Sequence, residues 1–141
     1  MEQLTPFEQE AIATILRGDH PVFAGLRTQL ARCEVSKREF TGVGFFTTLT
    51  IPAGVPSVPL DRRLALGDVH VTMDGVEHGV GLVLFVEEGR LALLEGFTYD
   101  DAWPDEIENY RITPGGITHY GGSQTDLEQA DAASAGPEAL T

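Results

Sequence analysis

The sequence contains a single cysteine, Cys33, which excludes an internal disulfide framework. Its apolar runs are all far shorter than the ~18 residues that a membrane-spanning helix requires. The first ten residues, MEQLTPFEQE, lack the basic start and the apolar centre of a secretory signal peptide. Together these absences favour a protein of the reducing cytoplasm that has no membrane segment.

The local signatures of the common enzyme classes are also missing. The sequence has no phosphate-binding loop, no His-Glu-x-x-His, no Cys-x-x-Cys and no Gly-x-Ser-x-Gly. A calcium loop needs oxygen ligands at alternate positions around a central glycine, and the acid-rich segment 100–108 does not have that pattern. The sequence therefore predicts no cofactor, no metal and no mechanism from a local motif.

Basic residues are scarce in the second half of the chain. The net charge is −13, and residues 1–63 contribute none of it because their seven acids and seven bases balance. Residues 64–112 carry eleven acids against Arg90 and Arg111, a net charge of −9. A field of this sign repels nucleic acid and anionic membranes and attracts cationic partners. The alternative is that the acids only keep a solvated face soluble.

At 141 residues and 42% hydrophobic content, the chain has the size and composition of one globular domain. Its most apolar stretch is GVGLVLFVEEGRLALLEG, residues 79–96. Two short runs rich in Val, Leu and Phe flank Glu87-Glu88-Gly89, a pattern typical of two strands joined by a turn. We predict that this hairpin forms the centre of a sheet and is covered on both faces.

Two helices are predicted before the sheet. Thr5 and Glu8 have the spacing of a capping box, with Pro6 at the first helical position. Gly18 ends this helix, and Pro21 starts a second one at once. The short link between the helices predicts a tight pair whose apolar stripes cover the sheet.

Asp74-Gly75 is the strongest hairpin signal. A two-residue turn there pairs Met73 with Val76, and its ladder continues with Val71 opposite His78 and Val69 opposite Val80. The predicted fold class is α+β, an N-terminal helix pair packed on a mostly antiparallel meander sheet of about five strands. Residues 1–121 form the predicted domain, and residues 122–141 are predicted to be a flexible acidic tail.

Glu95 is the best candidate for chemistry, because a charge within an apolar strand is costly unless it is paired or exposed. A three-residue turn pairs it with Gly81 and brings it near His70, whereas a two-residue turn pairs it with Leu82 and brings it near His78. Either pair could act as general acid and base or as half of a metal site. Alternatively, Glu95 lies at a sheet edge or is satisfied by structural donors. The weak catalytic candidates are Glu95, His70, His78 and Glu77.

A second candidate site surrounds Trp103, which has five acids within nine residues around it. An exposed tryptophan can anchor an interface, and acidic charge steers a basic protein toward it. The alternative is a solvated acidic turn whose tryptophan packs back on the sheet. The predicted partner-binding residues are Trp103, Asp100, Asp101, Asp105 and Glu106.

Two stretches carry a resemblance to known proteins. LTPFEQEAIATILRGDHPVFAGLRTQLARCEVSKREFTGVGFFTTLTIP resembles the start, and GVEHGVGLVLFVEEGRLALLEGFTYDDAWPDEI the second half, of a family of small, mostly uncharacterised bacterial proteins. The match covers roughly residues 4–112. The layout is also similar in architecture to single-domain immunity proteins of bacterial toxin systems. These resemblances imply a lineage and no site residues.

The sequence thus favours a non-enzymatic cytoplasmic binding protein, immunity- or inhibitor-like, that presents an acidic surface around Trp103 to a basic protein. One alternative is a small enzyme or small-ligand binder with a pocket around Glu95 and His70 or His78. Another is a homo-oligomer, in the simplest case a homodimer, that uses an apolar sheet face bearing Phe45 and Phe46. A shallow acidic surface, a deep pocket and a flat apolar face would distinguish the three.

Overall fold

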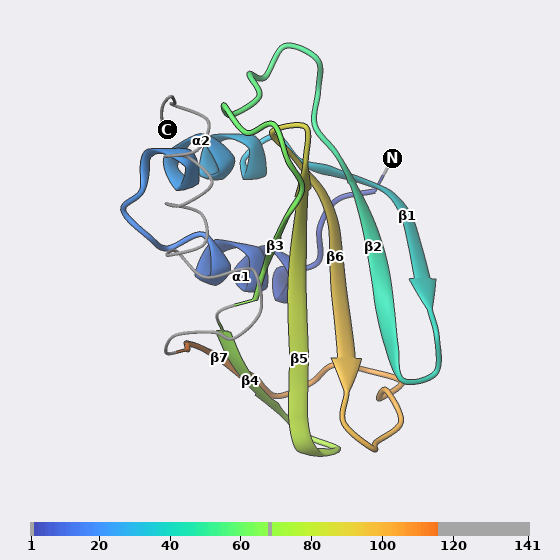
Figure 1. Cartoon of the computed structure of the whole chain (residues 1–141). Coiled ribbons are helices and arrows are strands. Elements are labelled where there is room, and N and C mark those ends of the chain that lie inside the picture. The colour runs from blue at the N-terminus through green and yellow to red at the C-terminus, as the bar shows by residue number, and fades with distance from the viewer. Residues whose placement is uncertain (1, 68, 116–141) are drawn as a thin grey trace.

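The computed structural model describes residues 2–67 and 69–115. Two helices lie against one face of a seven-stranded antiparallel sheet, which confirms the predicted α+β class (Figure 1). The predicted tail, residues 122–141, and the predicted boundary at residue 121 lie outside the described residues. The elements are α1 (Pro6–Ile15), α2 (Pro21–Leu30), β1 (Glu34–Phe40), β2 (Gly44–Thr50), β3 (Leu64–Leu66), β4 (Val69–Met73), β5 (Val76–Glu87), β6 (Arg90–Thr98) and β7 (Tyr110–Pro114).

The sheet is larger than the predicted five strands and is not a simple meander. Its strand order is β1-β2-β6-β5-β4-β7. β3 and β4 pair with the same edge of the long strand β5, β4 with its first half and β3 with its second half. β2 therefore lies beside β6, although three strands separate them along the chain. The sequence did not reveal β3 because a strand of three residues is too short to show an alternating pattern.

Both helices begin where the sequence predicts. In the capping box of α1, Thr5 Oγ1 accepts a hydrogen bond from Glu8 N at 3.1 Å, and Glu8 Oε1 accepts one from Thr5 N at 2.9 Å. α2 begins at Pro21, and the Nδ1 atom of the capping residue His20 accepts a hydrogen bond from Val22 N at 3.1 Å. Neither helix is long and apolar enough to cross a membrane.

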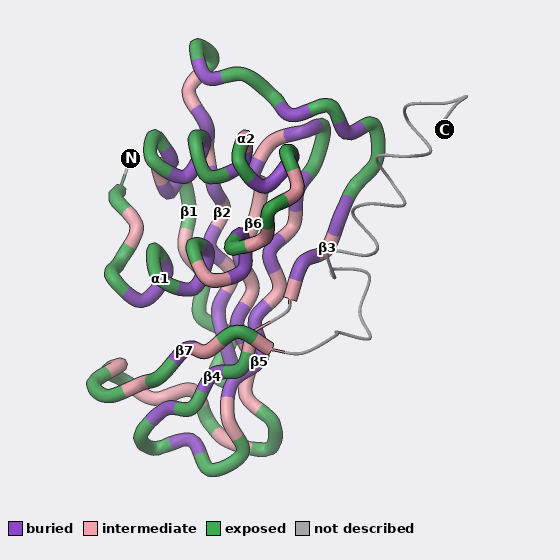
Figure 2. The backbone as a smooth tube through the Cα atoms, turned by 90° about the vertical axis from the view of Figure 1, so that its left-hand side faces the viewer, coloured by how far each residue is buried: buried purple, intermediate pink, exposed green. Residues whose placement is uncertain are grey.

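The helices cover the inner face of the sheet and lie in front of it in Figure 2. No described helix or strand packs on the outer face. The inner face and the helix stripes form one buried cluster. From residue 82 to 86 of β5 and from residue 93 to 97 of β6, buried residues alternate with residues that are only half-buried. The central hairpin is therefore covered on one face, and the prediction that it is covered on both is wrong for the described part of the chain.

A register shift changes the hairpin at Asp74-Gly75. The pair beside the turn forms as predicted, but Val71 then lies opposite Val80. The extra residues of β5 are accommodated where Gly79 adopts a φ of +81°, in the left-handed region that glycine tolerates. The predicted pairing of Val71 with His78 is therefore wrong, and so is the next predicted pair along the hairpin.

A second register shift decides the position of Glu95. The turn of the central hairpin has two residues, Glu88 (φ 53°) and Gly89 (φ 74°), as a type I′ turn requires. A register shift beyond the turn then places Val83 opposite Glu95. The predicted pairings of Glu95 with Gly81 and with Leu82 both assumed an unbroken ladder, and both are wrong.

Candidate functional site on the outer sheet face

The outer face of the sheet is apolar where it crosses β2, β6 and β5. Side chains directly opposite each other in an antiparallel sheet point to the same face, so the register shows which residues lie together. An open sheet face normally carries polar side chains, and this one carries mainly aromatic and aliphatic groups that are half-buried. We call this group the outer patch: Phe46, Val83, Phe85, Leu93, Glu95 and Phe97.

Glu95 is at the centre of the outer patch. Phe46 and Val83 lie directly opposite it on the two neighbouring strands, and Leu93 and Phe97 are the next outward-facing residues of β6. Within residues 2–67 and 69–115, the half-buried Glu95 carboxylate makes no hydrogen bond and no ion pair. A carboxylate that loses part of its hydration without gaining a partner raises the free energy of the fold. The patch thus has a negative centre that lacks a cation.

One end of the outer patch carries an arginine. The Arg63 guanidinium lies 4.1 Å from the centroid of the Phe85 ring, and Arg63 Nε donates to Glu87 Oε2 at 3.0 Å. A guanidinium in this position gains from the aromatic ring and from the carboxylate together. The side chains of Arg63 and Glu87 are about half exposed, so this pair lies at the solvent edge of the patch.

A pocket of about 290 Å³ adjoins the outer patch between β4, β5 and the end of β6. It brings together His70, Glu77 and His78, three of the four weak catalytic candidates, and all three are exposed. Glu95 is not among the residues that line it. Across residues 2–67 and 69–115, no group of three or more His, Cys, Asp or Glu side chains is arranged to hold a metal ion.

Two aromatic rings form one wall of this pocket. Phe97 and Tyr99 meet edge to face with their centroids 5.4 Å apart, and both rings lie over Gly81 of β5. A Cβ atom at Gly81 would collide with both side chains. The glycine therefore leaves room for both side chains above β5.

Trp103 packs on the inner side of the sheet, away from the outer patch. Its half-buried ring meets Phe45 edge to face at 5.1 Å between centroids, and its backbone N donates to Gly42 O at 2.9 Å. A cleft of about 60 Å³ separates Trp103 from Phe40, which is 67% exposed. Phe45 is 3% exposed, so the prediction that it lies on an open sheet face with Phe46 is wrong.

The predicted partner-binding acids lie on the loop between β6 and β7, at the bottom of Figure 1. Asp101 Oδ2 accepts a hydrogen bond from the backbone N of His78 at 3.3 Å, which fixes the start of this loop beside the pocket. Asp100, Asp105 and Glu106 are exposed. These acids therefore lie on a loop at one end of the sheet, while the Trp103 ring packs against Phe45.

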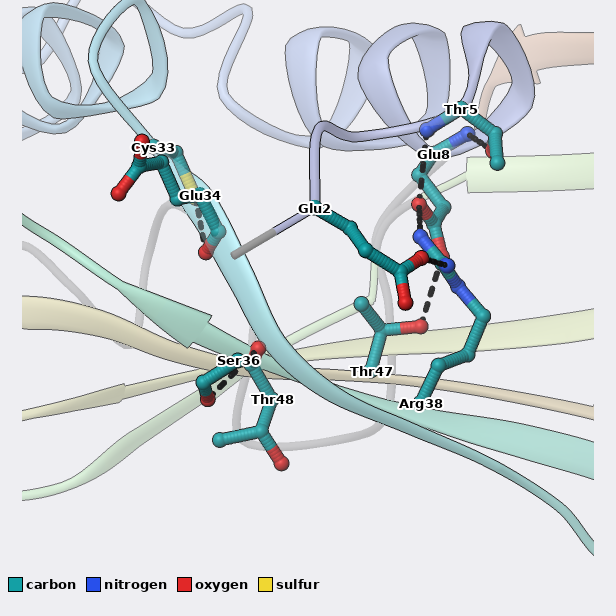
Figure 3. Close-up of polar contacts among 9 residues, drawn as sticks. All are labelled: Glu2, Thr5, Glu8, Cys33, Glu34, Ser36, Arg38, Thr47 and Thr48. Atoms are coloured by element: carbon teal, nitrogen blue, oxygen red, sulfur yellow. Dashed lines mark hydrogen bonds and ion pairs between the residues drawn. The ribbon is translucent and has the colours of Figure 1, made fainter.

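The sequence did not reveal one buried charged cluster, shown in Figure 3. Glu8 of α1 is 3% exposed, and its carboxylate accepts hydrogen bonds from Arg38 of β1 and from Thr47 of β2. Burial alone would raise the pKa of the Glu8 carboxyl, but the hydrogen bonds from Arg38, Thr5 and Thr47 outweigh burial and lower it below the ordinary value. Each carboxylate oxygen is occupied, so this cluster fastens α1 to the sheet.

Two other buried polar side chains are also structural. Gln29 of α2 donates to Pro56 O at 3.1 Å and to Gly89 O at 2.9 Å, and accepts from Leu91 N at 2.9 Å. It thereby ties the helix to the turn of the central hairpin. Cys33 is buried, and burial raises the pKa of its thiol to about 11, so the thiol stays protonated and unreactive at neutral pH.

No family model matches this chain, and no curated protein or solved structure is detectably similar to it. The resemblance to small bacterial proteins therefore stays a prediction. Function has to be argued from the site itself, whose distinguishing property is a carboxylate that has no partner among the described residues and lies within a half-buried apolar patch.

Proposed function

We propose that this chain is a non-enzymatic binding protein that docks a basic protein on its outer patch. The observation that carries the proposal is the Glu95 carboxylate, which lies among half-buried apolar side chains and has no partner within residues 2–67 and 69–115. Interface hot spots combine a few anchoring groups with surrounding apolar contacts that exclude water. A cation that reaches Glu95 would pair with it in a partly dehydrated site, which removes the cost of leaving that carboxylate alone.

The charge of the surrounding chain supports a basic partner. Residues 64–112 carry a net charge of −9, and Asp100, Asp105 and Glu106 are exposed at the open end of the sheet. Such a field accelerates the encounter with a cationic surface and excludes anionic ones. In this proposal the acidic loop keeps its predicted steering role, while the anchor is Glu95 in place of Trp103, whose ring is already packed against Phe45.

An immunity- or inhibitor-like role suits a small acidic protein of this kind. A basic toxin or nuclease has the charge that the outer patch and the acidic loop would select. The cytoplasm is the proposed compartment, because the only thiol, Cys33, is buried and unpaired.

The two alternative functions have weaker support. A flat apolar face would also serve a homodimer, but each copy carries −13, and two outer patches facing each other would bring two Glu95 carboxylates into one interface. The small-ligand alternative has a pocket lined by His70 and His78, yet Glu95, its intended acid, lies outside that lining.

The test is photo-crosslinking in the cells from which the gene comes. A photoreactive amino acid replaces Leu93 in the outer patch or, as the control, the exposed Ala13 of α1. We expect Leu93 to trap a basic protein, Ala13 to trap none, and Glu95→Gln to abolish the product at Leu93. A product that forms equally at Ala13, or that survives Glu95→Gln, would refute docking at the outer patch. A product with the mass of two copies of the chain would identify a homodimer instead.

A further inference from the structure

The outer face already contains one complete arginine site. The Arg63 guanidinium lies over the Phe85 ring at 4.1 Å and pairs with Glu87 at 3.0 Å. Phe85 and Glu87 are neighbours on one face of β5, and Arg63 reaches them from the segment before β3. Together they combine a planar cation, an aromatic face and a carboxylate at the surface of the sheet. Each of these attractions is modest when exposed, and together they hold one guanidinium.

Glu95 also has aromatic neighbours on the outer face, but no cation from the described residues pairs with it. Phe46 lies directly across from it on β2, at the short distance of an opposed pair, and Phe97 is the next outward-facing residue of its own strand. Two arginines of the sheet region already have other partners. Arg63 lies over the Phe85 ring, and Arg38 is bonded to the Glu8 carboxylate. The Glu95 carboxylate thus shares the outer face with two aromatic residues, and the described part of the chain provides no cation to pair with it.

The chemistry of this position favours arginine over lysine. A guanidinium is weakly hydrated and planar, so it stacks on aromatic faces and donates two parallel hydrogen bonds to one carboxylate. A lysine ammonium is strongly hydrated and carries three N–H donors. The side chains directly opposite Glu95, and those next to it on the same face of β6, are Phe46, Val83, Leu93 and Phe97, which offer no second acceptor. An ammonium would therefore lose more hydration free energy on entering this site than its contacts with the site would restore.

We infer that the partner inserts an arginine side chain at Glu95, flanked by apolar residues that cover the rest of the outer patch. This inference rests on the proposed function and names the group that the outer patch recognises. The charge of the patch supports this occupant over a second copy of the chain, because a second copy would present its own Glu95 to the same centre.

The probe is a random peptide library selected against the immobilised full-length protein, with a parallel selection against Glu95→Gln. The matched control is Glu39→Gln: Glu39 lies opposite Phe46 on the same outer face but is exposed and paired with Lys37 at 3.5 Å. We expect peptides selected on the native protein to share one arginine between apolar residues. Binding of a synthesised peptide should fall about tenfold or more on Glu95→Gln, on arginine-to-lysine replacement and on arginine-to-citrulline replacement, and should be unchanged on Glu39→Gln.

The other outcomes separate the inference from the function on which it rests. Peptides that carry lysine as often as arginine, and that still require Glu95, would overturn the arginine inference and leave docking of a basic partner intact. Peptides that bind Glu95→Gln as well as the native protein, or the absence of any enrichment over Glu95→Gln, would overturn both. A dimer in analytical ultracentrifugation that competes with the selected peptides would show that a second copy occupies the patch.

Discussion

Arg38 donates two hydrogen bonds to the carboxylate of Glu8, from Nε to Oε2 at 2.9 Å and from Nη2 to Oε1 at 2.7 Å. The side chain of Glu8 is 4% exposed and that of Arg38 is 16% exposed, so this ion pair is largely shielded from water. The Arg38 guanidinium also reaches outward to Glu2 Oε1 at 2.7 Å. One arginine of an edge strand therefore connects helix α1 and the N-terminal residues to the sheet.

Replacement of Arg38 by methionine should lower the free energy of unfolding by about 3 kcal/mol, because it leaves a buried carboxylate without its cation. The matched control is the adjacent Lys37→Met, which removes only an exposed pair with Glu39 and should change stability by less than about 0.5 kcal/mol. Urea denaturation of the two variants provides the measurement. Equal effects would mean that the pair with Glu8 does not stabilise the fold.

Stability should decline in acid because of Glu8. The folded-state pKa of this carboxyl lies below its ordinary value of 4.5, so the unfolded state takes up the proton first as the pH falls. The contribution of Glu8 is therefore complete above about pH 4.5 and is lost as the pH drops through the lowered folded-state pKa. Urea titrations between neutral pH and acid should show this decline in the native protein and a smaller one in Glu8→Gln. Identical declines would assign the acid sensitivity to other carboxyls.

Glu95→Gln should leave the free energy of unfolding unchanged, and Glu95→Leu should raise it by up to about 1 kcal/mol. The native carboxylate has apolar neighbours and no cation among the described residues, so its removal sacrifices no ion pair. Chemical denaturation checks both values. A loss of about 2 kcal/mol or more would reveal a structural partner for the carboxylate.

Trp103→Ala should destabilise the domain by about 2 kcal/mol, because the half-buried ring packs against Phe45 of the core. Phe40→Ala is the aromatic control: Phe40 is 67% exposed on the other side of the same cleft, and its loss should cost less than about 1 kcal/mol. Thermal or urea denaturation compares the two. If Trp103→Ala retains full stability, the ring is free to act in binding as the sequence predicted.

Gly44→Ala should cost about 2 kcal/mol, because a Cβ atom at this buried position collides with the backbone carbonyl of Gly96 on the neighbouring strand. Gly54→Ala is the matched control in the loop after β2, where a Cβ would have no atom within 4 Å. We expect its effect to be within about 0.5 kcal/mol of zero. Similar melting temperatures for both variants would show that β2 and β6 can separate to admit the extra methyl group.

The sequence predicts features that depend on neighbouring residues. The capping box of Thr5 and Glu8 and the turn at Asp74-Gly75 are both confirmed, because each is determined within four residues. Glu95 stands out for the same reason, as a single charge within an apolar run. The second role of Glu8 was missed because Arg38 and Thr47 reach it from distant strands.

The surroundings of Glu95 could not be predicted in this way. A shift of one residue in the register turns a side chain to the other face of a sheet, and the register shift in the β5–β6 hairpin has no clear mark in the sequence. The sequence could not predict that Phe46 lies beside Glu95, because β2 and β6 are not consecutive strands. Their pairing results from the packing of the whole domain.

The insertion of β2 between β1 and β6 also dictates an order of events during synthesis. When the first 63 residues leave the ribosome, β2 can pair with β1, but its other edge stays open until β3, β4, β5 and finally β6 have been made. That edge belongs to GFFTTLT, an apolar, β-prone segment of the kind that associates with other chains when left open. The nascent N-terminal half should therefore depend on chaperones until β6 arrives, and an isolated fragment of residues 1–63 should aggregate even though it contains both helices.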